Sequence, residues 1–300
     1  MSERHKLPQD FPMSYRGLDL NEHRDQSGDP VREYVDECYD IVTFDPSPMS
    51  IRDQVEGLHV DSGADVGVAS KEFRRIAIRG LVKSRTAWGL EDRIARLLHA
   101  FDIEEAIRAN PSTEGLSPFT FWCPTAVLPA GAPEPLVVQE MFIARPRGFP
   151  VTYERKSQGL SYNFAVELLC ADPRRYIVEP VIVPFSTAAG WVQGLPNWPV
   201  DMGVATYPVV TLVLSGNGAS NLTISDGTTS FVLNLSAAGA GTFTIDMKTK
   251  EIKKGSTPRN DLRSSGTRSY LLVPPGGADW EITNRTNLTS AEVRYHPARS

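Results

Sequence analysis

Carboxylates spaced along one loop are the first pattern in this sequence that could do chemistry, because carboxylate oxygens bind calcium. Asp61, Asp65 and Glu72 occupy three of the ligand places of an EF-hand loop laid over residues 61–72. The sixth place of that motif requires glycine for its sharp turn, whereas this chain has Val66 there. No helical pattern flanks the segment either. We therefore interpret it as a solvated loop and expect no metal site.

Histidines and cysteines are spaced too widely for metal binding or nucleophilic catalysis. The histidines are His5, His23, His59, His99 and His296, and the cysteines are Cys38, Cys123 and Cys170. An odd number of cysteines excludes a complete disulfide framework and is typical of free buried thiols in a reducing cytoplasm. The sequence contains no phosphate-binding glycine loop and no nucleophile elbow. We therefore expect a protein that is not an enzyme, with no catalytic residues and no cofactor.

Tryptophans in the last part of the chain are the remaining candidates for a binding site. Trp191, Trp198 and Trp280 lie in or beside segments with β-sheet patterns. An exposed indole on a sheet can stack on a sugar ring, so these residues are candidates for contact with a carbohydrate or a partner protein. Burial in a core or in a linker is the competing interpretation of all three.

Composition and charge narrow the class of protein that must position these residues. The chain has 300 residues, and its 41% hydrophobic and 22% charged content is typical of a globular protein. Residues 1–200 carry a net charge of −7 and residues 201–300 one of +2, which indicates two separate pieces. The net charge of −5 excludes a generally basic protein that coats DNA. The polar N-terminus has no secretory signal pattern, and no apolar run is long enough to span a membrane.

One amphipathic helix is predicted over residues 90–109. Its apolar stripe recurs at spacings of three and four and consists of Leu90, Ile94, Leu97, Leu98, Phe101 and Ile107. Thr86 is a candidate N-cap, and Asn110-Pro111 ends the pattern. We expect this stripe to pack against a sheet, because an isolated helix of this length is marginally stable in water.

Strand patterns dominate the rest of the chain. Residues 39–44 and 73–82 read as strands, with Ile76 and Ile78 on one buried face. Residues 137–144 and 162–170 predict an antiparallel pair joined by a long basic connection. Seven short segments with turn sequences between them predict a β-sandwich at the end of the chain: 207–214, 221–225, 231–235, 241–246, 270–273, 280–283 and 292–295. Its expected core is Leu212, Leu214, Ile224, Phe231, Leu233, Ile245, Leu272 and Ile282.

These patterns divide the chain into three predicted parts. Residues 1–40 form an N-terminal arm with extended or partner-dependent structure, because they show no sustained periodicity. Residues 41–190 form a β-rich domain with one or two helices, and residues 200–300 form the sandwich. The segment 184–203 is rich in glycine, proline and tryptophan and is interpreted as the boundary. The predicted fold class is mainly β.

Several short motifs, taken in order, resemble the distal tail protein (Dit) family of siphophages. The motifs are Phe73–Gly80 (FRRIAIRG), Asn163–Tyr176 (NFAVELLCADPRRY), Ala205–Val209 (ATYPV), Phe243–Asp246 (FTID) and Leu271–Gly276 (LLVPPG). The resemblance covers residues 60–295. It does not extend to residues 1–60, and the proline-rich segment 110–137 is longer than the family pattern.

The resemblance implies a structural protein of the virion tail tip, assembled in the host cytoplasm. The front domain would close into a homohexameric ring, and the C-terminal domain would be a galectin-like β-sandwich outside it. The implied partners are the major tail tube protein above the ring and the tail-associated hub or fibre protein below it. Viral DNA would pass through the ring during genome ejection without specific binding, which agrees with the acidic front part. A carbohydrate-binding host-recognition module, or a minor tail protein, is the alternative.

Overall fold

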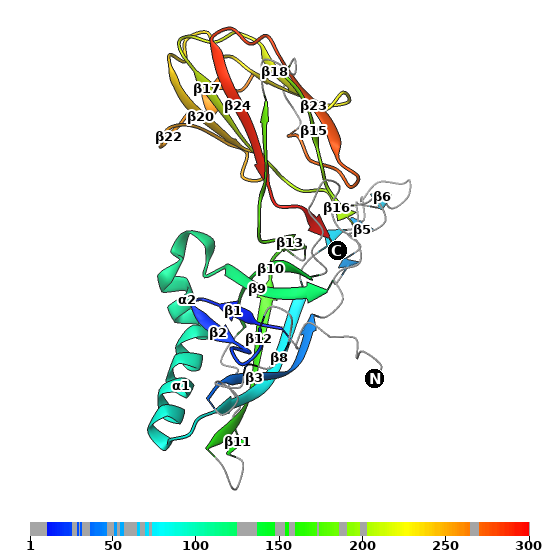
Figure 1. Cartoon of the computed structure of the whole chain (residues 1–300). Helices are drawn as coiled ribbons and strands as arrows, with labels where there is room; N and C mark the ends of the chain where they lie inside the picture. The colour runs from blue at the N-terminus through cyan, green and yellow to red at the C-terminus, as the bar shows by residue number, and fades with distance from the viewer. Residues whose placement is uncertain are drawn as a thin grey trace. The chain divides into compact units, whose positions relative to one another are not determined.

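The computed structural model of the chain describes most of its residues, and Figure 1 shows their arrangement. The described ranges are 11–25, 29, 31, 37–46, 74–124, 137–147, 160–172, 174–185, 191–198, 203–264 and 270–299, with the backbone of 51–52, 55–56, 65–66, 70–71 and 154–155. The structure is mainly β, as predicted, with two α-helices in these ranges. Neither helix is both long and apolar enough to cross a membrane.

The chain forms two compact units, and the second begins at Tyr176. This division lies ahead of the predicted boundary between residues 190 and 200. Strand β14 (Val181–Phe185) pairs along its whole length with β24 (Leu288–Tyr295), and β15 (Val192–Leu195) pairs with β23 (Ala278–Thr283). The segment interpreted as a linker therefore supplies two strands of the second unit, because irregular composition does not prevent an edge strand from pairing.

The first unit contains a twisted antiparallel sheet with the order β10-β12-β8-β3. These strands are β10 (Val137–Pro146), β12 (Ser161–Cys170), β8 (Arg74–Lys83) and β3 (Tyr39–Pro46). Ile76 and Ile78 of β8 face the core, as their spacing predicts. The predicted pairing of 137–144 with 162–170 is wrong for those residues, since within the described ranges only Arg145 and Pro146 of β10 pair with β12. A bulge at Val42 interrupts the pairing of β3 with β8 and leaves that side chain exposed.

Strand β10 belongs to two sheets and forms the corner between them. Its first eight residues pair with β9 (Ser117–Pro124), whereas Arg145 and Pro146 pair with β12. Strand β9 also pairs with β1 (Met13–Tyr15), which forms a hairpin with β2 (Leu18–Leu20). Between the two sheets lies an aromatic core that includes Phe44, Phe119, Phe121 and Phe142.

The N-terminal hairpin corrects the prediction of a free arm over residues 1–40. Met13, Tyr15, Leu18 and Leu20 are all buried, so residues 11–25 are part of the front core. The two strands are only three residues each, which is too short for a periodic pattern to be visible in the sequence. Similarly, β9 places residues 117–124 of the proline-rich segment 110–137 inside a sheet.

The predicted helix is present as two helices. Helix α1 (Ala87–Ala100) begins at the predicted cap, where the Thr86 hydroxyl accepts a hydrogen bond from the Gly89 amide at 3.0 Å. Helix α2 (Ile103–Ala109) starts again after Asp102, whose carboxylate accepts hydrogen bonds from two amides of the new first turn. The break occurs because an N-cap aspartate offers the backbone an alternative to continuing the first helix.

Short elements complete the first unit. They are β4 (Ile51–Arg52), β5 (Val55–Glu56), β6 (Asp65–Val66), β7 (Ser70–Lys71), β11 (Glu154–Arg155) and the 3-10 helix η3 (Pro111–Thr113). The chain passes to the second unit through β13 (Arg175–Ile177).

The second unit is a β-sandwich. One sheet has the order β14-β24-β17-β20-β21-β22 and the other β15-β23-β18-β19. The strands not yet placed are β17 (Val209–Leu214), β18 (Leu222–Ser225), β19 (Ser230–Leu233), β20 (Gly241–Asp246), β21 (Glu251–Lys254) and β22 (Thr257–Pro258). Strand β16 (Gly203–Val204) pairs with β25 (Ala298–Arg299) outside these two sheets, and η4 (Asn260–Leu262) follows β22.

The sandwich core matches the predicted residues with one exception. Seven of the eight predicted core side chains are buried, whereas Leu272 is only half-buried and Leu271 and Val273 are buried instead. The segment 270–273 forms a single bridge, between Val273 and Thr206, rather than a strand. Alternation therefore predicted the wrong face there, because a one-residue shift exchanges the two sides of an extended chain.

Candidate assembly surfaces

Reactive groups in the described residues are held in unreactive states. Within these ranges, no group of three or more His, Cys, Asp or Glu side chains could hold a metal ion. The side chains of the calcium-like segment 61–72 lie outside the described residues. All three cysteines are buried, and burial raises the pKa of Cys38 to about 11 and that of Cys170 to about 12. Both thiols therefore stay protonated at neutral pH and are poor nucleophiles.

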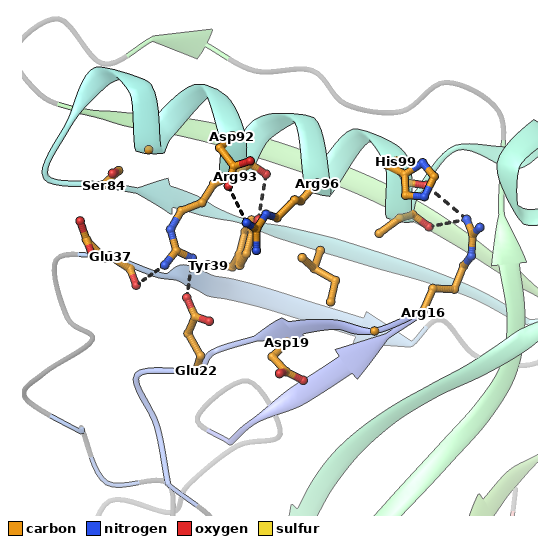
Figure 2. A pocket seen from close by; sticks show the side chains of 14 residues that line it. Arg16, Asp19, Glu22, Glu37, Tyr39, Ser84, Asp92, Arg93, Arg96 and His99 are labelled. Carbon is orange, nitrogen blue, oxygen red and sulfur yellow. Dashed lines mark hydrogen bonds and ion pairs between the residues drawn. The ribbon is translucent and has the colours of Figure 1, made fainter.

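A groove lies between the N-terminal hairpin and α1 of the first unit (Figure 2). It has a volume of about 410 Å³. Polar side chains from four segments line it: Arg16, Asp19, Glu22, Glu37, Tyr39, Ser84, Asp92, Arg93, Arg96 and His99. The question is which of these groups are available to a partner and which hold the unit together.

Arg16 joins the hairpin to the end of α1. It occupies the tight turn between β1 and β2, in the left-handed region with φ 48°, and Gly17 follows with φ 78°. Its guanidinium donates to the carbonyl oxygens of Ala100 at 2.9 Å and of His99 and Asp102 at 3.3 Å. The His99 and Ala100 carbonyls lie at the C-terminus of α1, where carbonyls lack intrahelical donors and a cation also interacts favourably with the helix dipole. The Asp102 carbonyl also accepts from the Ala106 amide of α2 at 3.0 Å.

Arg93 joins α1 to two other segments that line the groove. From the middle of α1 it reaches the Glu22 carboxylate at 2.5 Å and the Glu37 carbonyl at 3.0 Å. Its backbone carbonyl accepts a hydrogen bond from the Tyr39 hydroxyl at 2.8 Å, and its guanidinium lies over the Tyr39 ring. Burial raises the pKa of Tyr39 to about 12, so the hydroxyl remains a donor at neutral pH. The side chains of Arg16 and Arg93 therefore bind groups of the groove walls and hold these walls together.

The solvent face of the helices differs from this groove because it carries unpartnered apolar side chains. Trp88 is 83% exposed, and Leu98 and Ile107 are each 41% exposed. Leu98 and Ile107 were predicted to lie in the buried stripe, but the buried residues of α1 are Leu90, Ile94, Leu97 and Ala100. The stripe is narrower than predicted because α2 starts a new axis after Asp102 and because Leu98 lies beyond the edge of the contact with the sheet.

The three candidate tryptophans of the second unit are all buried. Trp191 is 4% exposed, and Trp198 and Trp280 are 0% exposed. Trp191 has φ 63° and packs in the sandwich core beside Arg285, whereas Trp198 lies under the Arg299 guanidinium at 5.1 Å. Stacking on a sugar requires an accessible ring face, so these rings provide packing and not a sugar platform.

The first unit also contains buried charged side chains that were not predicted from the sequence. Glu140 of β10 is 1% exposed, and its carboxylate lies 3.7 Å from the Arg175 guanidinium. Arg74 is also buried, with its guanidinium 5.3 Å from the centre of the Phe142 ring, and desolvation lowers its pKa. The only signal in the sequence is a glutamate inside the apolar run Val137–Ala144, since buried carboxylates require a partner.

Comparisons with known proteins add evidence at the level of the fold. A scan against protein-family models and a search of curated proteins both find no match. Among solved structures, the chain is similar to the Dit protein of phage SPP1, described as a paradigm of hub adsorption apparatus in phages that infect Gram-positive bacteria. The match has a TM-score of 0.60 at 14% identity and covers 97% of this chain and 99% of that one. This chain has the Dit fold.

Two weaker matches are chains of the phage p2 baseplate in its activated conformation. One, with strontium, has a TM-score of 0.44 at 9% identity and covers 97% of each chain. The other, with calcium, has a TM-score of 0.39 at 10% identity and covers 84% of this chain and 89% of that one. The resemblance to Dit proteins predicted from short motifs is thus confirmed for the fold by the SPP1 match alone. Because the Dit fold spans both units, neither unit is an unrelated addition.

Proposed function

We propose that this chain is a structural protein of a siphophage tail tip, a distal tail protein and not an enzyme. The observation that carries the proposal is the Dit fold over nearly the full length of both chains. Fold similarity alone does not specify function, so the proposal also rests on the surfaces. Arg16 and Arg93 form contacts within the first unit, and Trp88, Leu98 and Ile107 are exposed on helices that a partner chain can cover.

In this proposal the first unit builds a homohexameric ring, and the second unit is a galectin-like sandwich outside it. The ring joins the major tail tube protein to the tail-associated hub or fibre protein. Within the described ranges of the first unit, four large apolar side chains are exposed, namely Val42, Trp88, Leu98 and Ile107. Such side chains are typical of surfaces that become buried on association. The net charge of −7 over residues 1–200 favours DNA passage without binding to the wall.

The carbohydrate-binding alternative loses its main support in the second unit. It required accessible tryptophan rings on one sheet face, and Trp191, Trp198 and Trp280 are buried. Among the exposed large apolar residues in the described part of that unit, Tyr207 is the one aromatic side chain, at 38%. A single tyrosine is a weak basis for sugar recognition, so the structural role is preferred.

The test is the mass and symmetry of the full-length protein, measured by native mass spectrometry and negative-stain microscopy. We expect sixfold rings, in solution or in assembled tails. Trp88→Ala should weaken ring formation at least tenfold, since burying an indole is worth about 2–3 kcal/mol. Tyr207→Ala, which removes an exposed aromatic ring from the other unit, should leave the rings intact. A chain that stays monomeric both in solution and in assembled tails would refute the proposal.

A further inference from the structure

The outer edge of β3 is covered by the chain that follows the N-terminal hairpin. Strand β3 ends its sheet and pairs with β8 on one side only. On its other side the Asn21 amide donates to the Tyr39 carbonyl at 2.7 Å, and the Asn21 side-chain oxygen accepts from the Ile41 amide at 2.6 Å. Asn21 is fully buried and thereby satisfies two edge groups that a neighbouring strand would otherwise pair with.

His23 lies two residues further on and is held among charged groups. His23 is 5% exposed. Its Nε2 accepts a hydrogen bond from the Arg24 guanidinium at 3.2 Å. The carboxylate of Asp40, on β3, lies 3.4 Å from the same nitrogen and also contacts the Lys83 ammonium of β8 at 2.5 Å. The charged groups that face the ring are therefore one anion and two cations.

The hydrogen bond from Arg24 favours the neutral form of this histidine, whereas the nearby Asp40 carboxylate favours the charged form. An Nε2 that accepts from Arg24 carries no proton, and Nδ1 has no hydrogen-bond partner among the described residues. Adding a proton at Nε2 turns the acceptor into a second donor that faces the Arg24 donor. It also adds a third positive charge beside Arg24 and Lys83 in a desolvated site. Desolvation, the largest cause, together with Arg24 and Lys83 lowers the pKa of His23 below 6.5, against the opposing effect of Asp40.

We propose that His23 is a pH-sensitive latch that holds residues 21–25 over the outer edge of β3 at neutral pH and releases them in acid. The neutral ring fits the closed state, whereas the charged ring is accommodated only after the segment leaves the site and is hydrated. Release exposes the Tyr39 carbonyl and the Ile41 amide, which are spaced like the repeating unit of a β ladder. Unpaired groups of this kind are where a strand of another chain can add.

Acid should weaken the closed state, because His23 binds a proton more tightly in the released state. The pKa of His23 is lower in the closed state than in the released state, where it has its ordinary value of 6.5. Closing is therefore fully favourable above that value and weakens as the pH falls through it. Between pH 7 and pH 5 the opening equilibrium rises by at most about 25-fold, the ceiling set by a released pKa near 6.5.

The experiment is hydrogen exchange on the full-length chain between pH 7 and pH 5, corrected for the intrinsic rates of exchange. The peptides followed contain Asn21 and Ile41, whose amides form the edge contacts. We expect the opening constant of these peptides to rise in the wild type, up to the ceiling of about 25-fold. His23→Gln keeps an acceptor near the position of Nε2 and cannot titrate, so its opening constant should stay flat. His99→Gln, a change at an exposed histidine of α1, should behave as the wild type.

A second variant keeps the test decisive if His23→Gln does not fold. Arg24→Gln removes one of the two cations that oppose the charged ring, so its opening constant should rise less steeply than that of the wild type. The latch is refuted if the wild type and either His23→Gln or Arg24→Gln open equally between pH 7 and pH 5. It is equally refuted if the edge peptides of the wild type remain protected at pH 5.

Discussion

The two units cover their sheet edges with different chemistry. In the second unit, residues 262–264 run beside the outer edge of β19 and form backbone hydrogen bonds with it, from Asn234 to Leu262 at 2.8 Å and from Ser264 to Val232 at 3.0 Å. In the first unit, the side chain of Asn21 covers β3, next to a buried histidine. Backbone groups do not titrate, whereas the cover in the first unit depends on a titratable neighbour.

The same contrast appears in what holds the elements together. Turns of the second unit are fixed by neighbouring side chains, such as Asp226, which accepts from the Thr228 and Thr229 amides. Elements of the first unit are joined by polar contacts between distant residues, such as Arg93 to Glu22 and Arg16 to Ala100. The second unit also has long-range polar contacts, but these include neutral donors such as Asn197, which donates to the Val273 carbonyl at 3.1 Å. We infer that the first unit relies more on charged side chains to join its distant elements.

The largest expected effect is a charge placed in the helix–sheet contact of the first unit. Leu97 is 1% exposed, and Leu97→Asp should unfold that unit, because an unpaired buried carboxylate costs several kcal/mol. Calorimetry should then show the transition of the sandwich alone. Leu98→Asp makes the same change one residue later at a half-exposed site and should keep both transitions. Equal behaviour of the two variants would contradict the assignment of the buried face.

A cavity in the sandwich core should act on the second unit alone. Phe231 is fully buried, and Phe231→Ala should lower the free energy of unfolding of that unit by about 3–5 kcal/mol. Two transitions that separate further in calorimetry would support independent cores. Val232→Ala, which truncates the half-buried neighbour, should cost about 1 kcal/mol or less. An equal shift of both units after Phe231→Ala would show that they unfold as one.

Removal of the helix cap supplied by the hairpin should have a moderate effect on the first unit. Arg16→Ala deprives the end of α1 of charge-assisted hydrogen bonds and should cost about 1–2 kcal/mol in urea unfolding. Asp19→Ala removes an exposed charge from the same hairpin and should change stability by less than about 0.5 kcal/mol. The assignment of Arg16 as a cap is wrong if Asp19→Ala is the more damaging change.

The smallest expected effect is the acid sensitivity of one sandwich turn. Backbone and side-chain hydrogen bonds from Thr228 and Thr229 lower the pKa of Asp226 below 3.8, despite the opposing effect of burial. The stabilisation is therefore present above pH 4 and is lost as the pH falls through the lowered value. Asp226→Asn keeps the acceptor oxygen without the charge, so its unfolding midpoint should fall less between pH 4 and pH 2. A parallel loss in both proteins would assign the acid sensitivity to other carboxylates.

Much of the fold was predictable because its signals are local. Thr86 marks the start of α1, alternation places Ile76 and Ile78 in the core, and the turn sequences of the second unit separate most of its strands. In each case the structural feature depends on a few consecutive residues. These residues form a helix cap, an alternation of buried and exposed side chains, or a turn. The predicted fold class followed from these signals, and the order of short motifs indicated the Dit fold.

Tertiary structure alone decided the features that depend on distant residues. Arg16 caps a helix that ends at Ala100, and His23 lies beside Asp40 and Lys83 only because β3 pairs with β8. Whether Leu98 is buried depends on the extent of the sheet beneath α1. A sequence states which groups the chain carries and how they alternate, but the free energy of a contact depends on distance and desolvation in the folded chain. Those two quantities are set by packing between segments that are remote in the sequence.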